Sequence, residues 1–293
     1  MRVSANCIRC LVDKQEERVQ TQPVHGNVKA RYMKAILQVI GTSDEETSAP
    51  ELVEEITKVY ETFFGEEKDF RDIKRMHNQK MLDVEDAIWK KIQEASDSVE
   101  RAILYARAGN YIDYGAMKHV DEDVLKMLLE RVDQERLDPV CYRSLRKDLE
   151  CAKHLVYVTD NCGEIVMDKQ LVRVLKEQYP SLLITVLVRG KQVLNDATIE
   201  DAEQIGMTKL VPVVENGTGI AGTSFRYINE ESRSVLDEAD VIIAKGQGNF
   251  ESMYGCGRNI YYLFLCKCDF FATRFGLTKN AGVLMQEGDY EQR

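Results

Sequence analysis

Polar side chains follow three predicted strands at the point where each strand ends. The strands are expected at 154–160, 182–188 and 240–245, where β-branched and aliphatic residues run together. Because ligands bind beyond the carboxyl ends of the strands in an open parallel sheet, we expect these polar side chains to lie close together. The residues concerned are Asp160, Asn161, Asp196 and Lys245.

The residue types at these strand ends are suited to phosphoryl chemistry. Carboxylate and amide oxygens, as on Asp160, Asn161 and Asp196, are hard ligands for Mg²⁺ or Mn²⁺. An ion bound in this way takes further ligands from a substrate phosphate, and Lys245 adds a positive charge for the same group. The pattern predicts metal-assisted phosphoryl chemistry, with either a water or Asp160 as the attacking group.

Glycines flank the same side chains. Gly163 and Gly246 would let backbone N–H groups approach an oxyanion, and the helix expected from Glu164 would direct its positive end toward that anion. Glu164 would orient Lys245 or a metal-bound water, or would only complement the helix dipole. Asp168 lies one turn further along the same helix face. Each group also has an ordinary structural interpretation, because Asp and Asn after a strand often form Asx turns or helix caps.

Three other phosphate-binding or nucleotide-binding patterns are disfavoured. No Gly-x-Gly-x-x-Gly follows the first strand, and Glu251 stands where the segment from Gly246 would need its third glycine. No Gly-x-x-x-x-Gly-Lys-Ser/Thr loop occurs in the sequence. Cys162 replaces the second acid of an Asp-x-Asp phosphatase loop.

The elements that would position these residues change in character along the chain. The first half is helical in periodicity, whereas the second half alternates strands with helices, which predicts βαβ units and a parallel sheet. The two parts meet near 140–152, where Pro139 interrupts the pattern. Helices are expected at about 4–20, 27–40, 48–65, 83–108, 122–132, 164–179 and 196–205, and further strands at 210–214 and 261–268.

Acidic residues outnumber basic ones in this chain of 293 residues, and the net charge is −10. The long-range field would repel phosphate, so nucleic acid and anionic membranes are disfavoured as partners. Most of the excess lies in residues 42–69, where ten acids and two lysines give −8. We expect this segment to be a solvated helix face away from the strand ends, so a small phosphorylated metabolite is not excluded.

The sequence favours a cytoplasmic location. No apolar run approaches the roughly 20 residues that span a bilayer, and Arg9, Asp13 and Lys14 interrupt any signal-peptide core. The eight cysteines are too sparse for a disulfide scaffold in a chain of this length. The oligomeric state is not indicated.

Four short segments occur in series: GNYID at 109–113, DNCGE at 160–164, NDAT at 195–198 and KGQGNFE at 245–251. A chain with these segments in this order resembles the damage-control phosphatases, long known as domain of unknown function 89. The resemblance implies a metal-dependent phosphomonoester hydrolase that uses Mn, Mg, Co or Ni. Its substrates would be sugar phosphates or damaged phosphorylated metabolites.

The resemblance also implies an α/β fold with two domains. An all-helical domain would cover 1–145, and a Rossmann-like α/β/α domain with a mainly parallel sheet would cover 146–293. The active site would lie in the cleft between them, and the N-terminal segment would pack on the C-terminal domain.

By the same resemblance, Asp160, Asn161 and Asp196 are the metal ligands, and Lys245 contacts the phosphate. Asn110 and Asp113 would be the contribution of the helical domain to the cleft; the alternative is that the helix stops at Gly109 and an Asx turn follows. Pocket walls would come from Tyr111, Tyr114 and Arg258. Further contacts to substrate or phosphate are expected from Gly163, Glu164, Asn110, Asp113, Gly246 and Asn249.

The N-terminal Cys7-x-x-Cys10 resembles the stand-alone microbial branch of the family. Cys268 would be a third thiol if the two ends of the chain meet, which would make a second thiol site. A closed zinc site needs four ligands, so simple packing of these thiols is the alternative.

Two other functions stay open. One branch of the family has been described as carrying out carboxyl methyl transfer, which would require S-adenosylmethionine, but no glycine-rich loop follows the first strand. A non-catalytic regulatory module would instead use a metal, Cys7, Cys10 and the acidic surface.

Overall fold

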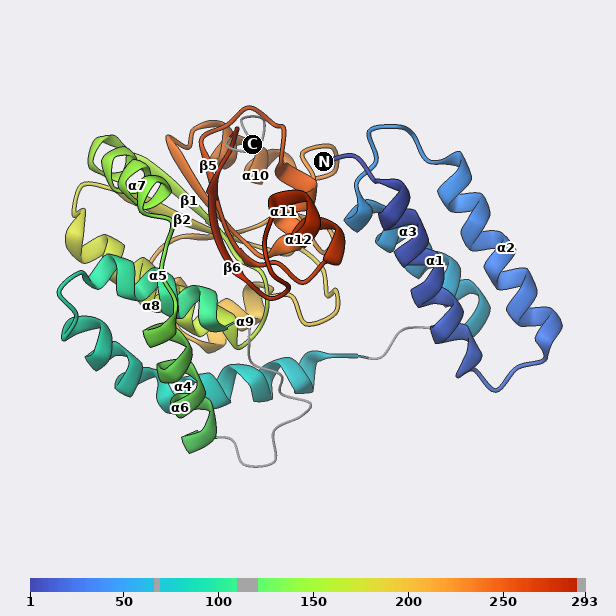
Figure 1. The fold of residues 1–293 in the computed structure, drawn as a ribbon, viewed down its shortest axis with the longest axis horizontal. Helices are drawn as coiled ribbons and strands as arrows, with labels where there is room; N and C mark the ends of the chain where they lie inside the picture. The colour runs from blue at the N-terminus through green and yellow to red at the C-terminus, as the bar shows by residue number, and fades with distance from the viewer. Residues whose placement is uncertain (66–68, 110–120, 289–293) are drawn as a thin grey trace.

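A mostly parallel sheet forms the centre of the α/β part of the molecule (Figure 1). The computed structural model describes residues 1–65, 69–109 and 121–288, and within them the sheet has six strands in the order β3-β2-β1-β4-β5-β6. The first five strands are parallel, and β6 is antiparallel to β5. The strands are β1 His154–Val158, β2 Leu183–Val188, β3 Val213–Glu215, β4 Val241–Lys245, β5 Ile260–Leu265 and β6 Gly282–Gln286. The predicted α/β class with a mainly parallel sheet is confirmed.

The strand order reverses beside β1. The chain runs from β1 outward through β2 and β3, and then returns to β4 on the other side of β1. In such a sheet the connections leave β1 and β4 toward opposite faces, so a crevice opens beyond their carboxyl ends. Asp160 follows β1 and Lys245 ends β4, so both belong to this crevice.

Helices cover both faces of the sheet and make two cores. Leu155 and Tyr157 of β1 pack with residues of α4, α5 and α8, whereas Val156 and Val158 pack on the opposite side with residues of α10, α11 and α12. The alternation follows from the two-residue period of a strand. These helices are α4 Arg71–Gln93, α5 Ser98–Ala108, α8 Glu164–Gln178, α10 Glu230–Asp237, α11 Gln247–Met253 and α12 Asp269–Phe275.

The first three helices form a separate lobe, drawn in blue in Figure 1. They are α1 Ala5–Gln20, α2 Gly26–Thr42 and α3 Ala49–Phe64. Tyr32 is at the centre of this lobe, with its ring edge-on to Phe63 and Phe64. The lobe is tied to the α/β part because the amino group of Met1 donates to the carbonyl of Glu251 at 2.5 Å.

Three element boundaries differ clearly from the sequence prediction, and the first is the start of α4, which lies at Arg71 rather than at about residue 83. The helix expected over 83–108 is divided into α4 and α5, because the Asp97 side chain accepts from the N–H groups of Val99 and Glu100 and starts a new helix. Pro139 begins a helix rather than interrupting one. It is the first residue of α7, Pro139–Cys151, and the side chain of Asp138 caps that helix.

Several short elements were not anticipated from the sequence, namely β6 and helices α10 to α12. Each has at most eight residues, which is too short for a clear helical or strand period. The remaining elements are α6 Asp121–Gln134, α9 Ile199–Gln204 and a 3-10 turn at Met207–Lys209. Among the described helices, none combines the length and apolar character needed to cross a membrane.

Candidate active site

The loops after β1 and β2 are joined by hydrogen bonds, which brings Asp160, Asn161 and Asp196 together. Asn161 and Asp196 form a short antiparallel bridge, and the N–H of Ala197 donates to the carbonyl of Asp160 at 2.8 Å. The N–H of Cys162 donates to the carbonyl of Asn195, also at 2.8 Å. Three residues predicted to be neighbours from their strand ends therefore share one edge of the sheet.

The Asn161 side chain links two carboxylates. Its Nδ2 donates to Asp160 Oδ2 at 2.6 Å and to Glu164 Oε2 at 3.2 Å. Both amide hydrogens are used in this way, so the amide oxygen is the atom of this group that could act as a ligand.

Arg189 occupies the position between the two aspartates, and sequence reasoning did not single it out. Its side chain is 1% exposed. Nε donates to Asp196 Oδ2 at 2.7 Å, and Nη2 lies 3.7 Å from Asp160 Oδ1. The available signal was an arginine directly after the buried end of β2, where a charge is costly unless it is paired.

Lys245 is fully buried, and its ammonium group is bound within the protein. Nζ donates to Glu164 Oε1 at 2.5 Å, to Asp168 Oδ1 at 2.7 Å and to the carbonyl of Ala106 at 2.8 Å. Burial alone would lower the pKa of Lys245, but the two carboxylates raise it above its usual value. An ammonium group has three hydrogens, so this arrangement leaves none for the phosphate contact expected from the sequence.

Glu164 thus lies between the lysine and the asparagine, since one carboxylate oxygen accepts from Lys245 and the other from Asn161. Of the two interpretations left open from the sequence, the contact with Lys245 is observed. Asp168, one turn later, also accepts from the hydroxyl of Tyr157 at 2.7 Å. Burial raises the pKa of Asp168 to about 6, although the charge of Lys245 opposes this shift.

The buried groups of the crevice have an excess of negative charge. Four carboxylates face two cations, Arg189 and Lys245, so the fully ionised set carries −2. Burial, together with the charges of Asp196 and Glu164, holds the pKa of Asp160 well above its usual range. One divalent cation would balance the set, so these residues fit a bound metal. The four carboxylates are Asp160, Glu164, Asp168 and Asp196.

The candidate ligand set is two aspartates and an amide. No group of three or more His, Cys, Asp or Glu in the described part of the chain is arranged to hold a metal ion. An octahedral ion such as Mg²⁺ keeps several waters and binds few carboxylates, so a set of this size is sufficient for it.

Other residues predicted to contact the phosphate have internal partners. The N–H of Gly163 donates to Asn78 Oδ1 of α4 at 2.7 Å. Asn249 is buried, and its Nδ2 donates to the carbonyls of Thr159 and Lys245. Asn78 was missed from the sequence because its position in α4 gives no indication that it reaches a loop 85 residues away.

Helix α5 reaches the crevice at its carboxyl end. A Cβ built on Gly109 would lie 3.3 Å from the Cα of Glu164, so the two backbones are in contact. Asn110 and Asp113, with Tyr111 and Tyr114, lie outside the described residues.

Arg258 is a correction, because the structure places it far from the pocket wall expected of it. It precedes β5, at the opposite edge of the sheet from the crevice, and there it pairs with Asp237 and donates to the carbonyl of Leu236.

The three thiols are not assembled into a metal site. Cys7 and Cys10 lie on α1, Cys10 is exposed, and Cys268 precedes α12. The described residues form no three-ligand group of His, Cys, Asp or Glu, so the second site expected from Cys7, Cys10 and Cys268 is not observed. All eight cysteines are free thiols.

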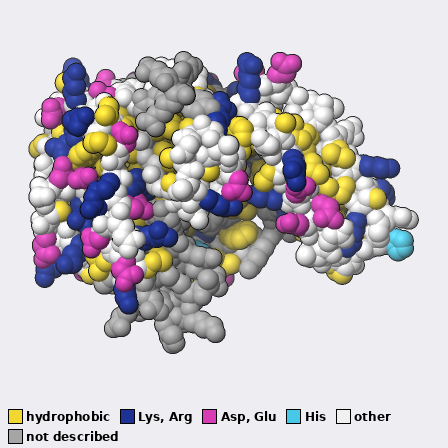
Figure 2. Space-filling view, viewed as in Figure 1, with side chains coloured by type: hydrophobic (Ala, Val, Ile, Leu, Met, Phe, Trp, Pro, Cys, Tyr) yellow, Lys and Arg dark blue, Asp and Glu magenta, His cyan; other side chains and the backbone are white. Residues whose placement is uncertain are grey.

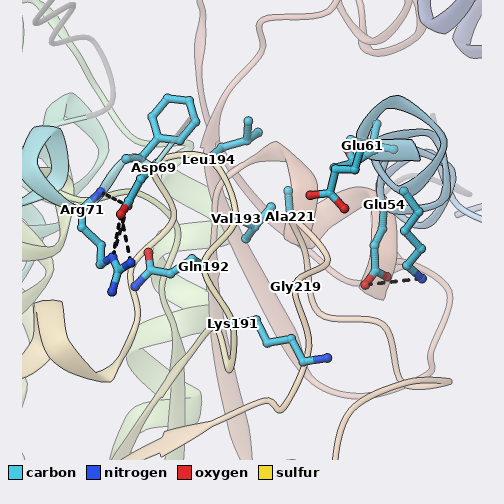
Figure 3. A pocket seen from close by; sticks show the side chains of 14 residues that line it. Glu54, Glu61, Asp69, Arg71, Lys191, Gln192, Val193, Leu194, Gly219 and Ala221 are labelled. Carbon is cyan, nitrogen blue, oxygen red and sulfur yellow. Dashed lines mark hydrogen bonds and ion pairs between the residues drawn. The ribbon is translucent and has the colours of Figure 1, made fainter. Parts of the chain in front are cut away.

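A pocket of about 500 Å³ lies between α3 and the loop that leads to Asp196 (Figure 3). Figure 2 shows the surface hollowed between the two lobes in this region. Glu54 and Glu61 of α3 line one wall, and Lys191 and Leu194 belong to the other. The expectation that the acidic segment lies away from the strand ends is therefore wrong.

The same acidic segment also holds the lobes together. The carboxylate of Glu51 is buried and accepts from the hydroxyl of Ser224, which belongs to the α/β part. Asp44 pairs with Arg226 at 2.5 Å. The helical lobe is thereby attached at the edge of the sheet where the crevice opens.

Comparisons with known proteins agree on one family. The model of the damage-control phosphatase ARMT1-like domain matches residues 3–283. A damage-control phosphatase of Pyrococcus horikoshii is 28% identical over 98% of both chains, and one of Archaeoglobus fulgidus is 33% identical over 75% of this chain and 76% of its own. The crystal structure of a P. horikoshii protein of the domain of unknown function 89 family superposes with a TM-score of 0.83 at 26% identity, over 98% of this chain and 99% of that one.

Proposed function

Because the chain belongs to the family of damage-control phosphatase ARMT1-like domains, we propose that it is a metal-dependent phosphatase of small phosphorylated metabolites. The observation that carries this proposal is the crevice beyond β1 and β4. Two aspartates and an asparagine meet there within a buried set of charges that sums to −2.

A divalent cation would be held by Asp160, Asn161 and Asp196, and when bound it would supply Lewis-acid stabilisation of charge on the phosphoryl group. We propose Mn²⁺, Mg²⁺, Co²⁺ or Ni²⁺. Asp160 and Asp196 would provide the carboxylate ligands, and Asn161 its amide oxygen. Its amide nitrogen is already directed at Asp160 and Glu164.

Lys245 would act through Glu164 rather than on the phosphate itself. Its ammonium group holds one oxygen of Glu164, and the other oxygen accepts from Asn161. This chain of contacts fixes the rotation of the Asn161 amide, which sets the direction of the amide oxygen. We therefore assign Lys245 and Glu164 to positioning.

The organic part of the substrate would occupy the pocket between α3 and residues 191–194. Its walls carry both acidic and basic side chains, with Glu61 and Lys191 on opposite sides, and apolar surface from Val53 and Leu194. Such a lining suits a polar metabolite that carries a phosphomonoester, including a sugar phosphate. The free thiols favour a reducing compartment such as the cytoplasm.

A screen of phosphometabolites against the four metals tests the proposal. Phosphate release from the metal-loaded protein is expected for at least one small phosphomonoester, and it should be absent in Asp160→Asn. Wild-type activity in that variant would contradict the site. Binding of S-adenosylmethionine, measured by calorimetry, with no phosphate release would favour the methyltransferase alternative. Phosphatase activity in the Cys7→Ser, Cys10→Ser double variant would argue against the regulatory module that uses these thiols.

A further inference from the structure

We propose that Arg189 is the positioning residue that preforms the metal site by holding Asp160 and Asp196 at a fixed separation before the ion binds. The inference rests on the proposed function in one respect, namely that these two aspartates are ligands of a divalent cation. It assigns a role to a residue that no motif in the sequence identified.

The first support is the position of the guanidinium group. It lies between the two carboxylates, with Nε 2.7 Å from Asp196 Oδ2 and Nη2 3.7 Å from Asp160 Oδ1. The Nη2 atom is buried and has no hydrogen-bond partner among the described residues. A buried donor without an acceptor is costly, and the nearby Asp160 oxygen is the group that can satisfy it.

The second support is that Arg189 is itself held in place. Nη1 donates to Thr223 Oγ1 and to Asn249 Oδ1, each at 3.1 Å. The backbone N–H of Arg189 donates to the carbonyl of Ala197, which immediately follows Asp196. Two side-chain partners hold the Nη1 end of the guanidinium, and the backbone bond ties Arg189 to the residue after Asp196, so the guanidinium is a rigid reference for both carboxylates.

The physical reason for such a residue is the repulsion between buried aspartates. Two carboxylates that share one crevice favour either separation or protonation, and both would disrupt the ligand set. Arginine suits this position because its guanidinium stays charged in proteins and presents its donors in a fixed plane. A lysine at position 189 would keep the positive charge but would lose the planar arrangement of donors.

The test measures Mn²⁺ binding by calorimetry on the metal-free, full-length protein, without substrate. Arg189→Gln should bind Mn²⁺ about 10–100-fold more weakly than wild type, as is typical when the partner of a metal ligand is lost. Arg189→Lys should lie between the two. If the positive charge of Arg189 only repelled cations from the site, its removal would instead tighten Mn²⁺ binding. Affinity equal to or tighter than wild type in Arg189→Gln would overturn the proposal.

Two further variants make the result decisive. Thr223→Val removes an acceptor of Arg189 without changing charge, and it should weaken Mn²⁺ binding by less than Arg189→Gln. If Arg189→Gln does not fold, weaker binding in Thr223→Val and Arg189→Lys supports the proposal, and wild-type affinity in both overturns it. Arg107→Gln is the matched control, since Arg107 is an equally buried guanidinium paired with Glu135; it should lose stability and keep its Mn²⁺ affinity.

The same data separate this inference from the proposed function. A wild-type protein that binds Mn²⁺ but releases no phosphate from any substrate contradicts the phosphatase and leaves the Arg189 result intact. A wild-type phosphatase whose Arg189 variants bind Mn²⁺ normally contradicts the inference alone.

Discussion

The backbone of Gly246 lies directly against the carboxylate of Asp160. A Cβ built on residue 246 would be 2.1 Å from Asp160 Oδ2 and 2.2 Å from its carboxyl carbon. Gly246 also has a φ of +81°, a conformation that L side chains rarely adopt. The end of β4 therefore packs against the acid that follows β1, and no side chain fits between them.

Gly246→Ala should inactivate the protein, because the new methyl group displaces Asp160. A displacement of about 1 Å is enough for a loss of roughly 100-fold in turnover. Phosphate release at saturating metal is the measurement. Gly257→Ala is the control, since Gly257 has a φ of +74° with open space around its Cβ position. That variant should lose about 1–2 kcal/mol of stability and no activity.

Asp160→Asn should lose turnover without becoming less stable in the metal-free state. The substitution removes one charge from a buried set that carries −2, so repulsion with Asp196 and Glu164 falls. Wild type should instead be stabilised by metal, by about 2.7 kcal/mol at one hundred times the dissociation constant. Thermal unfolding with and without Mn²⁺ checks both expectations, and a metal-induced rise in Tm in the variant would count against Asp160 as a ligand.

Lys245→Met should be strongly destabilising, because Glu164 and Asp168 then stay buried without their cation. Breaking a buried ion pair from one side costs about 3–5 kcal/mol. The double variant with Asp168→Asn should recover part of this loss, since one of the two stranded charges is removed. Urea unfolding of the two single variants and the double variant gives the coupling; strictly additive effects would mean that Lys245 and Asp168 do not depend on each other.

Leu194→Ala should impair large substrates more than small ones. Leu194 lines the pocket, is 44% exposed and has a φ of +46° in the turn that leads to Asp196. Losing its apolar contact should raise KM about tenfold for a metabolite that fills the pocket. Phenyl phosphate should be little affected. Leu194→Gly should raise the KM of the large metabolite relative to that of phenyl phosphate by the same factor, while it also relieves the backbone strain at this position. Leu37→Ala on α2 is the control, since Leu37 is also exposed, and it should change neither KM.

Asp201 should make the folded protein sensitive to acid. Burial alone would raise its pKa, but hydrogen bonding and charge from Lys74, 2.7 Å away, with help from Thr198, lower the pKa below the usual 3.8. A lowered folded-state pKa contributes stability that is present above about pH 3.8 and is lost as the pH falls below it. Urea unfolding from pH 6 to pH 3 should show a shallower decline for Asp201→Asn than for wild type. Parallel curves would exclude this contribution.

The sequence determined the order of the longer elements and the edge at which the site lies. The longer strands and helices after residue 153 have clear periods, and the residue that follows a strand is known once the strand is located. Asp160, Asn161 and Asp196 could therefore be placed together, because parallel strands end at the same edge of a sheet. Short elements such as β6 were missed since five residues carry too little periodicity.

Only the tertiary structure decided what each site residue contacts. Lys245 lies 139 residues from Ala106 and 77 from Asp168, and Asn78 lies 85 from Gly163, so their partners depend on how α4, α5 and α8 pack on the sheet. The sequence placed Lys245 beside the phosphate, whereas burial gives its ammonium three internal acceptors. Arg189 had no motif at all. Long-range hydrogen bonds leave no period in the chain, and the balance of buried charge can be read only after the packing is known.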